Sequence, residues 1–295
     1  MAEIYQGVVA ASEEALRLDA FLARHFSRLS RREIAELIAS GQARVNGRLS
    51  KKGARVHLGD TITAPAVLTL SANAALSIRV IYADSALIVL DKAAGIPSVA
   101  LRHSETNTAA NFLAACFPET LRAGPRSLEG GLVHRLDSAT SGVLLAARTP
   151  DAYASLREQF RARTVDKQYL AVVEGCLQSS GQVTFRLTPS GPRGQHMRVV
   201  VDGQGQEAST IYAPIATSER RTLLRVSITT GVRHQIRAHL AALGHPIVGD
   251  THYGSPHRAP RLYLHAEALT FISPATSQRV HCTSPAPPDF FATAE

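Results

Sequence analysis

The chain has 295 residues, of which 45% are hydrophobic and 19% charged, and its formal net charge is +8. At about 150 residues per domain this length predicts two domains, and the composition excludes a disordered chain, a collagen and a disulfide-stapled mini-protein. Three widely spaced cysteines without a C-x-x-C pair indicate a reducing compartment and argue against a zinc knuckle. Apolar runs are too short to span a membrane and no signal peptide is recognised, so we expect a soluble cytoplasmic protein without a membrane partner.

Positive charge is concentrated in one stretch near the N-terminus. Between residues 24 and 55, nine Lys or Arg stand against two Glu, and the rest of the chain is nearly neutral. A balanced chain with one basic module is typical of a protein that binds nucleic acid through that module, although a solvated basic face is the alternative. The candidate contacts in this module are Arg28, Arg31, Arg32, Arg44, Lys51 and Lys52.

The same stretch has the pattern of a small α/β unit, which we place at residues 15–65. Apolar residues at helical spacing over 18–22 predict one helix. Ser30 and Glu33 form a capping box that predicts the start of a second helix, and Gly41 predicts its end. Asn46-Gly47 is typical of a tight hairpin turn. Small and polar residues over 66–77 predict a linker.

From residue 78 to about 290 the pattern changes to strands mixed with a few helices. Because the two do not alternate strictly, the sequence favours an α+β domain with a mixed, mainly antiparallel sheet over a doubly wound one. The predicted strands cover 78–82, 86–90, 168–173, 183–187, 208–213 and 223–229, and the predicted helices cover about 149–163 and 232–243.

Several common motifs are excluded by their context. The G-x-G-x-x-A sequence at 203–208 is followed by a β-branched strand rather than the helix that a dinucleotide site requires. The chain has no Walker A motif, no G-x-S-x-G and no H-E-x-x-H. His234 and His239 are five residues apart, on different faces of a helix, so we predict satisfied or surface histidines and no metal site.

The remaining candidates for chemistry are Asp137, Arg237 and Tyr169. Asp137 lies in a polar loop between two apolar segments. This pattern fits two alternatives equally well: a carboxylate presented from a rigid scaffold, and a salt-bridged surface turn. Arg233 and Arg237 are one turn apart on a predicted helix. A guanidinium that points into the protein needs a carboxylate partner, whereas one that points to solvent belongs to the edge of an ordinary amphipathic helix. Tyr169, at a strand start, is equally consistent with sheet packing.

The segment His134-Arg135-Leu136-Asp137-x-x-Thr140-Ser141-Gly142 resembles the signature loop of the pseudouridine synthases similar to RluA, RluC and RluD. The basic unit resembles an S4 RNA-binding domain. Four further motifs of the family are present in the family's order, namely Leu90-Asp91-Lys92-x-x-Gly95-Ile96-Pro97, Lys167-x-Tyr169-Leu170-Ala171, Thr230-Gly231-x-x-His234-Gln235-Ile236-Arg237-x-His239 and Gly244-His245-Pro246-Ile247-Val248-Gly249-Asp250. The sequence departs from the family after Lys92, where Ala93-Ala94 replaces the usual proline pattern.

The resemblance implies isomerisation of uridine to pseudouridine in RNA, without a cofactor or metal, by an enzyme that we expect to be a monomer. It implies that Asp137 is the essential carboxylate, as nucleophile or as base, that Arg237 pairs with it, and that Tyr169 packs on the flipped uracil. Arg135 would fill the space that the base leaves or contact a phosphate. Large-subunit ribosomal RNA is the expected partner and transfer RNA the alternative. Two other functions stay open: an inert S4-type ribosome assembly factor, and a hydrolytic N-glycosidase.

Overall fold

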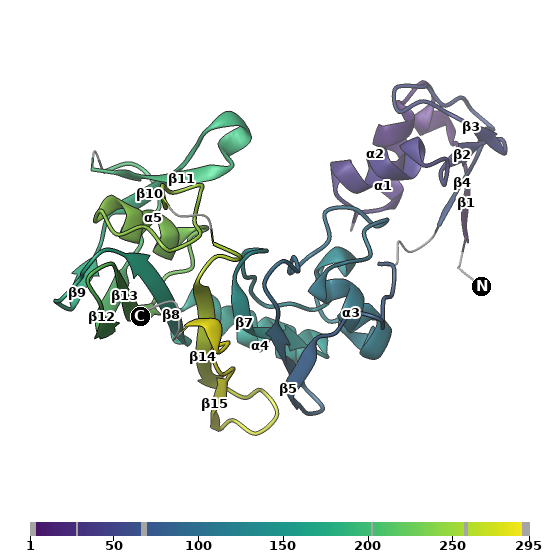
Figure 1. Ribbon diagram of the computed structural model, residues 1–295. Helices are drawn as coiled ribbons and strands as arrows, with labels where there is room; N and C mark the ends of the chain where they lie inside the picture. Colours follow the sequence, from purple (N-terminus) through teal and green to yellow (C-terminus); the bar gives the residue numbers. More distant parts are fainter. Residues whose placement is uncertain (1–3, 28, 66–69, 202, 257–258, 291–295) are drawn as a thin grey trace.

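The computed structural model describes residues 4–27, 29–65, 70–201, 203–256 and 259–290. It contains a small N-terminal unit and a larger unit built on one long sheet (Figure 1). Arg28, one of the expected RNA contacts, lies outside the described residues. Within the described ranges, no helix is long and apolar enough to cross a membrane.

The first unit packs two helices on a small antiparallel sheet. The Ser30 hydroxyl accepts a hydrogen bond from the Glu33 N–H (3.2 Å), and the Glu33 carboxylate accepts one from the Ser30 N–H (2.6 Å), so the predicted capping box is present. Asn46 and Gly47 both have positive φ, as the predicted hairpin turn requires. The strand order is β1-β4-β2-β3, with elements β1 (Ile4–Val8), α1 (Leu18–His25), α2 (Arg31–Ala39), β2 (Arg44–Val45), β3 (Arg48–Leu49) and β4 (Thr61–Pro65).

The structure differs from the expected boundaries of this unit at both ends. Strand β1 pairs with β4 along its whole length, so the sheet begins at Ile4, before residue 15. In the described part of the expected linker, Leu70 is buried in the core of the second unit, and the Asn73 N–H donates to the Asn111 carbonyl (3.0 Å). Residues 70–77 therefore pack against the larger unit.

The second unit is a mixed sheet with helices on both faces. Its strand order is β5-β6-β7-β14-β8-β13-β12-β9, with β15 paired to β14, and within the described residues β7–β14 is the one parallel pair. Helix α4 packs on one face, and α3 and α5 share the core of the other. The first elements are β5 (Arg79–Ala83), β6 (Leu87–Lys92), α3 (Ala109–Cys116), β7 (Ser141–Ala147), α4 (Pro150–Arg161) and β8 (Asp166–Glu174). Next come β9 (Gly181–Val183), β10 (Arg186–Ser190), β11 (His196–Val200), β12 (Thr210–Thr217), β13 (Arg221–Ile228), α5 (Gln235–Ala242), β14 (Leu264–Ile272) and β15 (Arg279–Thr283).

Three local predictions need correction. The strand predicted at 183–187 is split: β9 belongs to the long sheet, whereas β10 pairs with β11 in a separate hairpin beside α5 (Figure 1). Helix α5 begins at Gln235 rather than at 232, because His234 has left-handed backbone angles (φ 54°, ψ 20°). Strands β14 and β15 were not predicted, although β14 lies between β7 and β8.

Candidate active site

The loop that carries Asp137 leads into β7 and is held by the loop that follows β6. The Ser98 hydroxyl donates to the Leu136 carbonyl (2.8 Å) and accepts from the Leu136 N–H (3.0 Å). The Gly95 N–H donates to the Ser138 carbonyl (2.8 Å). These bonds fix the backbone on both sides of Asp137, as in the first of the two alternatives that the sequence left open.

Lys92, at the end of β6, joins the two loops from the inside. It is fully buried, and its ammonium donates to the carbonyls of Ala93 (2.9 Å), Ile96 (2.7 Å) and Ser138 (3.1 Å). Burial lowers the pKa of Lys92 to about 7, although the nearby Asp137 carboxylate opposes this shift. All three donors of the ammonium are used, so Lys92 stabilises the loop and does not line the pocket.

Arg237 lies between two carboxylates. Its Nη1 is 3.0 Å from Asp137 Oδ2, and the other edge of the guanidinium binds Asp250 in a bidentate pair, Nε–Oδ2 at 2.7 Å and Nη2–Oδ1 at 2.9 Å. Burial alone would lower the pKa of Arg237, but the ion pairs with Asp250 and Asp137 raise it, so the guanidinium stays charged. Asp250 thus anchors Arg237, and Arg237 orients Asp137.

The start of helix α5, whose first turn carries Arg237, is anchored to neighbouring loops. Gln235 is buried, and its amide accepts from the Thr230 hydroxyl (2.7 Å) and donates to the Ser209 carbonyl (2.9 Å). Arg233 lies before the helix, is exposed, and donates to backbone carbonyls of the β10–β11 hairpin, among them His196 (3.2 Å). Arg233 and Arg237, predicted on neighbouring helix turns, therefore have separate roles.

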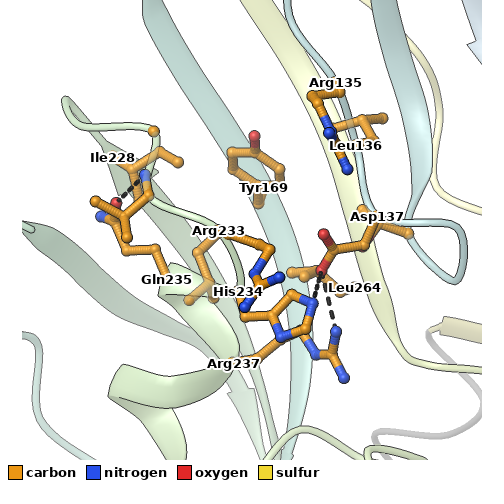
Figure 2. A pocket seen from close by; sticks show the side chains of 14 residues that line it. Arg135, Leu136, Asp137, Tyr169, Ile228, Arg233, His234, Gln235, Arg237 and Leu264 are labelled. Atoms are coloured by element: carbon orange, nitrogen blue, oxygen red, sulfur yellow. Dashed lines mark hydrogen bonds and ion pairs between the residues drawn. The ribbon is translucent and has the colours of Figure 1, made fainter. Parts of the chain in front are cut away.

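Tyr169 shares a pocket of about 250 Å³ with Asp137 (Figure 2). Its side chain comes from β8, the strand next to β14, and burial together with the Asp137 charge raises the pKa of the phenol well above its usual value. The tyrosine is therefore a neutral ring with a protonated hydroxyl. Apolar side chains of the pocket come from Leu136, Ile228, Val232, Ile236 and Leu264.

His234 also lines this pocket, which its sequence spacing from His239 did not suggest. His234 Nε2 is 3.8 Å from Asp137 Oδ2, and Nδ1 is hydrogen-bonded to the Tyr253 hydroxyl (3.0 Å). Burial lowers the pKa of His234 to about 4, and the Asp137 carboxylate opposes this. His239, by contrast, is a satisfied core histidine bonded to Thr210 and Phe185 (both 2.9 Å).

Asp250 and Tyr253 are the other site residues that the reasoning from sequence gave no role. Asp250 stands in the motif that ends Gly249-Asp250, and the Tyr253 ring lies against the Arg237 guanidinium, 5.0 Å from centroid to Cζ. A buried arginine whose one known partner is a partly exposed carboxylate needs a second negative charge nearby. That requirement is the signal that could have pointed to a further carboxylate such as Asp250.

Arg135 is exposed at the edge of the pocket, where a groove continues along α4. Two further hollows continue this groove. The one of about 600 Å³ shares Arg135, Tyr169 and Gly231 with the pocket of Asp137, and the one of about 480 Å³ shares Gly231 and Val232 with it. We call this the basic groove. Its charged lining consists of Arg157, Arg161, Arg163, Lys167 and Arg186 against Glu158 and Glu207.

The structure places the described RNA-contact candidates of the first unit on its surface. Arg31 and Arg32 are exposed in the first turn of α2, and Lys51 and Lys52 are exposed in the loop after β3. Arg44 is exposed in β2 and donates to the Gly47 carbonyl (3.1 Å). In the part of the chain that the structure describes, no group of three or more His, Cys, Asp or Glu could hold a metal ion.

Comparisons with known proteins agree with this arrangement. Residues 86–242 match the family model of RNA pseudouridylate synthase, and residues 16–62 match that of the S4 domain. The chain is 35% identical to ribosomal large subunit pseudouridine synthase D of Xanthomonas campestris pv. campestris, covering 96% of this chain and 89% of that protein. It is 31% identical to ribosomal large subunit pseudouridine synthase C of Pasteurella multocida, covering 95% and 90%.

Among solved structures, human RNA pseudouridylate synthase domain containing 1 shares the fold, with a TM-score of 0.59 at 24% identity over 72% of this chain and 84% of that one. The match of the family model to more than half of the chain, and the near full-length relatives, agree with the signature loop at Asp137. The chain therefore belongs to the RluA family of RNA pseudouridine synthases, and it carries an N-terminal S4 domain.

Proposed function

We propose that this isomerase converts specific uridines of large-subunit ribosomal RNA to pseudouridine, with Asp137 as its essential carboxylate. The observation that carries the proposal is the Asp137–Arg237 pair at 3.0 Å in a pocket shared with Tyr169. The names of the relatives in Xanthomonas and Pasteurella support the large-subunit substrate. Transfer RNA is the alternative substrate.

The reaction breaks the bond from ribose C1′ to N1 of uracil, rotates the base and forms a bond from C1′ to C5. Asp137 either attacks C1′ or removes a proton from the sugar, and both routes need an ionised carboxylate. Arg237 pairs with Asp137 Oδ2 and leaves Asp137 Oδ1 without a hydrogen bond or ion pair to any described residue. Figure 2 shows this second oxygen turned toward the open side of the pocket, where Tyr169 and Arg135 lie.

Tyr169 is assigned to the base. Its buried, neutral ring offers a flat apolar face to a flipped uracil. Late in the cycle its hydroxyl is proposed to act as a relay, which takes the proton from C5 as it gives its own proton to solvent. Extraction of a base from its stack leaves a gap, and the exposed Arg135 at the pocket edge is placed to fill it or to bind a flanking phosphate.

RNA binding is assigned to two basic surfaces. We propose that residues 78–290, together with the segment 70–77 that packs against them, form the catalytic domain. Its basic groove would bind phosphates on either side of the target nucleotide. Residues 15–65, together with the paired strand β1, are proposed as the RNA-binding domain. The exposed Arg31, Arg32, Arg44, Lys51 and Lys52 are its proposed phosphate contacts, which give affinity more than sequence choice.

Two functions of other classes are less well supported. An inert assembly factor has no use for a buried arginine aimed at a carboxylate in an open pocket. A hydrolytic N-glycosidase usually needs two carboxyl groups facing one substrate. Among the described residues that line the pocket Asp137 is the only carboxylate, and Asp250 is fully buried and bound bidentately to Arg237.

The experiment that tests the proposal is pseudouridine mapping at nucleotide resolution in cells that lack the gene. The parent gene should restore the missing sites, whereas Asp137→Asn, which keeps the shape of the side chain, should restore none. A deletion strain that retains every pseudouridine of the parent strain would contradict the proposal. Sites found only in transfer RNA would correct the substrate.

The matching assay in vitro follows tritium release from RNA labelled at uridine C5. We expect Asp137→Asn to lower the rate by at least about 100-fold while RNA affinity stays unchanged. An assembly factor would release no tritium, and an N-glycosidase would release free uracil. Retained turnover within about tenfold of the parent would contradict the assignment of Asp137.

A further inference from the structure

His234 adopts a backbone conformation that histidine rarely takes. Its φ of 54° and ψ of 20° lie in the left-handed region, and its carbonyl accepts the first hydrogen bond of α5, from the Ala238 N–H (2.9 Å). Glycine or asparagine would fit this position at lower cost. A strained residue beside a catalytic carboxylate suggests that the imidazole itself is needed there.

A directional chain of hydrogen bonds determines which ring nitrogen of His234 carries the proton. The Met197 N–H donates to the Tyr253 hydroxyl oxygen (2.9 Å), and among the described residues His234 Nδ1 (3.0 Å) is the one group placed to accept the tyrosine proton. In the neutral ring the proton then lies on Nε2. That nitrogen is 3.8 Å from Asp137 Oδ2, and such catalytic contacts are often long in the free enzyme and tighten in the complex.

We propose that His234 is a positioning residue for the isomerisation, and this rests on the proposed role of Asp137. As a neutral Nε2–H donor it holds Asp137 Oδ2 together with Arg237, so that Oδ1 is the oxygen presented to the ribose. Figure 2 shows His234 and Arg237 both reaching the same carboxylate oxygen. Tyr253 sets the tautomer, and through Met197 it connects the β10–β11 hairpin to the catalytic carboxylate.

The surroundings of His234 favour the neutral ring. Asp137 and Asp250 act to raise its pKa, but burial together with the charges of Arg237 and Arg233 outweighs them. A neutral donor leaves the negative charge of Asp137 to be balanced by Arg237 alone. The carboxylate therefore keeps its reactivity while its orientation is fixed.

The test compares His234→Gly with Ser277→Gly, which also replaces a left-handed residue (φ 57°) but lies in the turn between β14 and β15. Both variants relieve backbone strain, so both should fold. We expect kcat of His234→Gly to fall by about tenfold or more, with KM for RNA within about twofold of the parent, and Ser277→Gly to match the parent. Equal kcat in the two variants, or a loss confined to KM, would overturn the proposal.

Chemical rescue and NMR separate positioning from a merely structural role. Added imidazole should restore turnover to His234→Gly, and the restored rate should rise with pH as the imidazole loses its proton. His234→Asn, whose amide N–H can donate, should retain more activity than His234→Gly. Absence of rescue together with inactive His234→Asn would count against the donor role.

Nitrogen NMR of the parent at neutral pH should show His234 protonated on Nε2. Tyr253→Phe keeps the aromatic ring against Arg237 but removes the hydroxyl, so it should give a mixture of the two His234 tautomers and a lower kcat. A proton found on Nδ1 of the parent would overturn the proposal. A parent that forms no pseudouridine would contradict the proposed function instead.

Discussion

At the scale of single residues, the site depends on one guanidinium shared by two carboxylates. Asp250 is fully buried and takes the bidentate edge, whereas Asp137 is partly exposed and takes the single Nη1 contact. The bidentate pair with Asp250 fixes the orientation of the Arg237 guanidinium, so its Nη1–H points toward Asp137. A lysine cannot satisfy both carboxylates with the same geometry.

We therefore expect Arg237→Lys to lower kcat strongly although it keeps the charge. Arg237→Ala should in addition destabilise the fold by about 3–5 kcal/mol, because it leaves Asp250 buried and unpaired. Arg233→Ala is the control, since this exposed side chain donates to hairpin carbonyls and should affect kcat less. Urea unfolding and single-turnover kinetics measure the two effects. Parent-like kinetics of Arg237→Lys would rule out the orienting role.

A second prediction at this scale concerns pH. Burial, with the charges of Lys167 and Arg157, lowers the pKa of His134 from 6.5 to about 3, and its Nε2 accepts from the Leu145 N–H (3.0 Å). Below pH 6.5 His134 becomes protonated in the unfolded chain, whereas in the folded protein it stays neutral down to about pH 3. The free energy of unfolding should fall by about 1.4 kcal/mol per pH unit from this histidine, down to pH 3.

Urea denaturation at several values between pH 7 and pH 4.5 checks this prediction. His134→Gln keeps an acceptor for Leu145 and does not titrate, so its unfolding free energy should depend less steeply on pH. Equal slopes for parent and variant would show that another group causes the acid sensitivity.

At the scale of elements, the site depends on the parallel contact of β7 with β14. Gly142 pairs with Ala266 at this contact, which places the Asp137 loop beside the strand that adjoins Tyr169. Gly142 has a φ of +112°, and a Cβ there would overlap the carbonyl of Ala266. The two strands can approach at this point only because residue 142 has no side chain.

Gly142→Ala should therefore destabilise the protein by more than about 3 kcal/mol, from backbone strain and from the clash together. Gly244→Ala is the matched control, because its φ is also positive (+85°) and its Cβ would meet open space. That control should cost about 1 kcal/mol. Equal losses in the two variants would show that the strand contact tolerates a side chain.

At the scale of the whole molecule, two units with separate cores meet at a small polar contact. Glu33, the capping residue of α2, also contacts His103 of the second unit (3.3 Å), and both side chains are largely buried. Because 70–77 packs on the second unit, a deletion intended to remove only the first should end at residue 69.

We expect the chain of residues 70–295 to fold and to retain turnover on short RNA, since its core is separate. Its affinity for long RNA should fall, and the dependence of that affinity on salt should become shallower, because phosphate contacts are lost. Arg31→Ala with Arg32→Ala in the full chain should shift both quantities in the same direction, to a smaller extent. An unchanged salt slope in the truncated protein would exclude the S4 domain as the binding platform.

The sequence by itself determined what depends on neighbouring residues. The capping box at Ser30, the turn at Asn46-Gly47 and the start of α4 after Thr149 follow from bonds within a few positions, and all three are present. Asp137 and Arg237 were singled out through the resemblance of their motifs to those of the family, whereas the local pattern alone left a salt-bridged turn and an ordinary helix edge as alternatives.

Only the tertiary structure decided what depends on distant segments. Local periodicity carries no information on strand order, so the central place of β14 between β7 and β8 could not be predicted. The second carboxylate on Arg237 and the left-handed backbone of His234 beside Asp137 likewise arise where residues more than 90 positions from the signature loop converge. Each requires a balance of charge, burial and backbone strain that exists only once the core has formed.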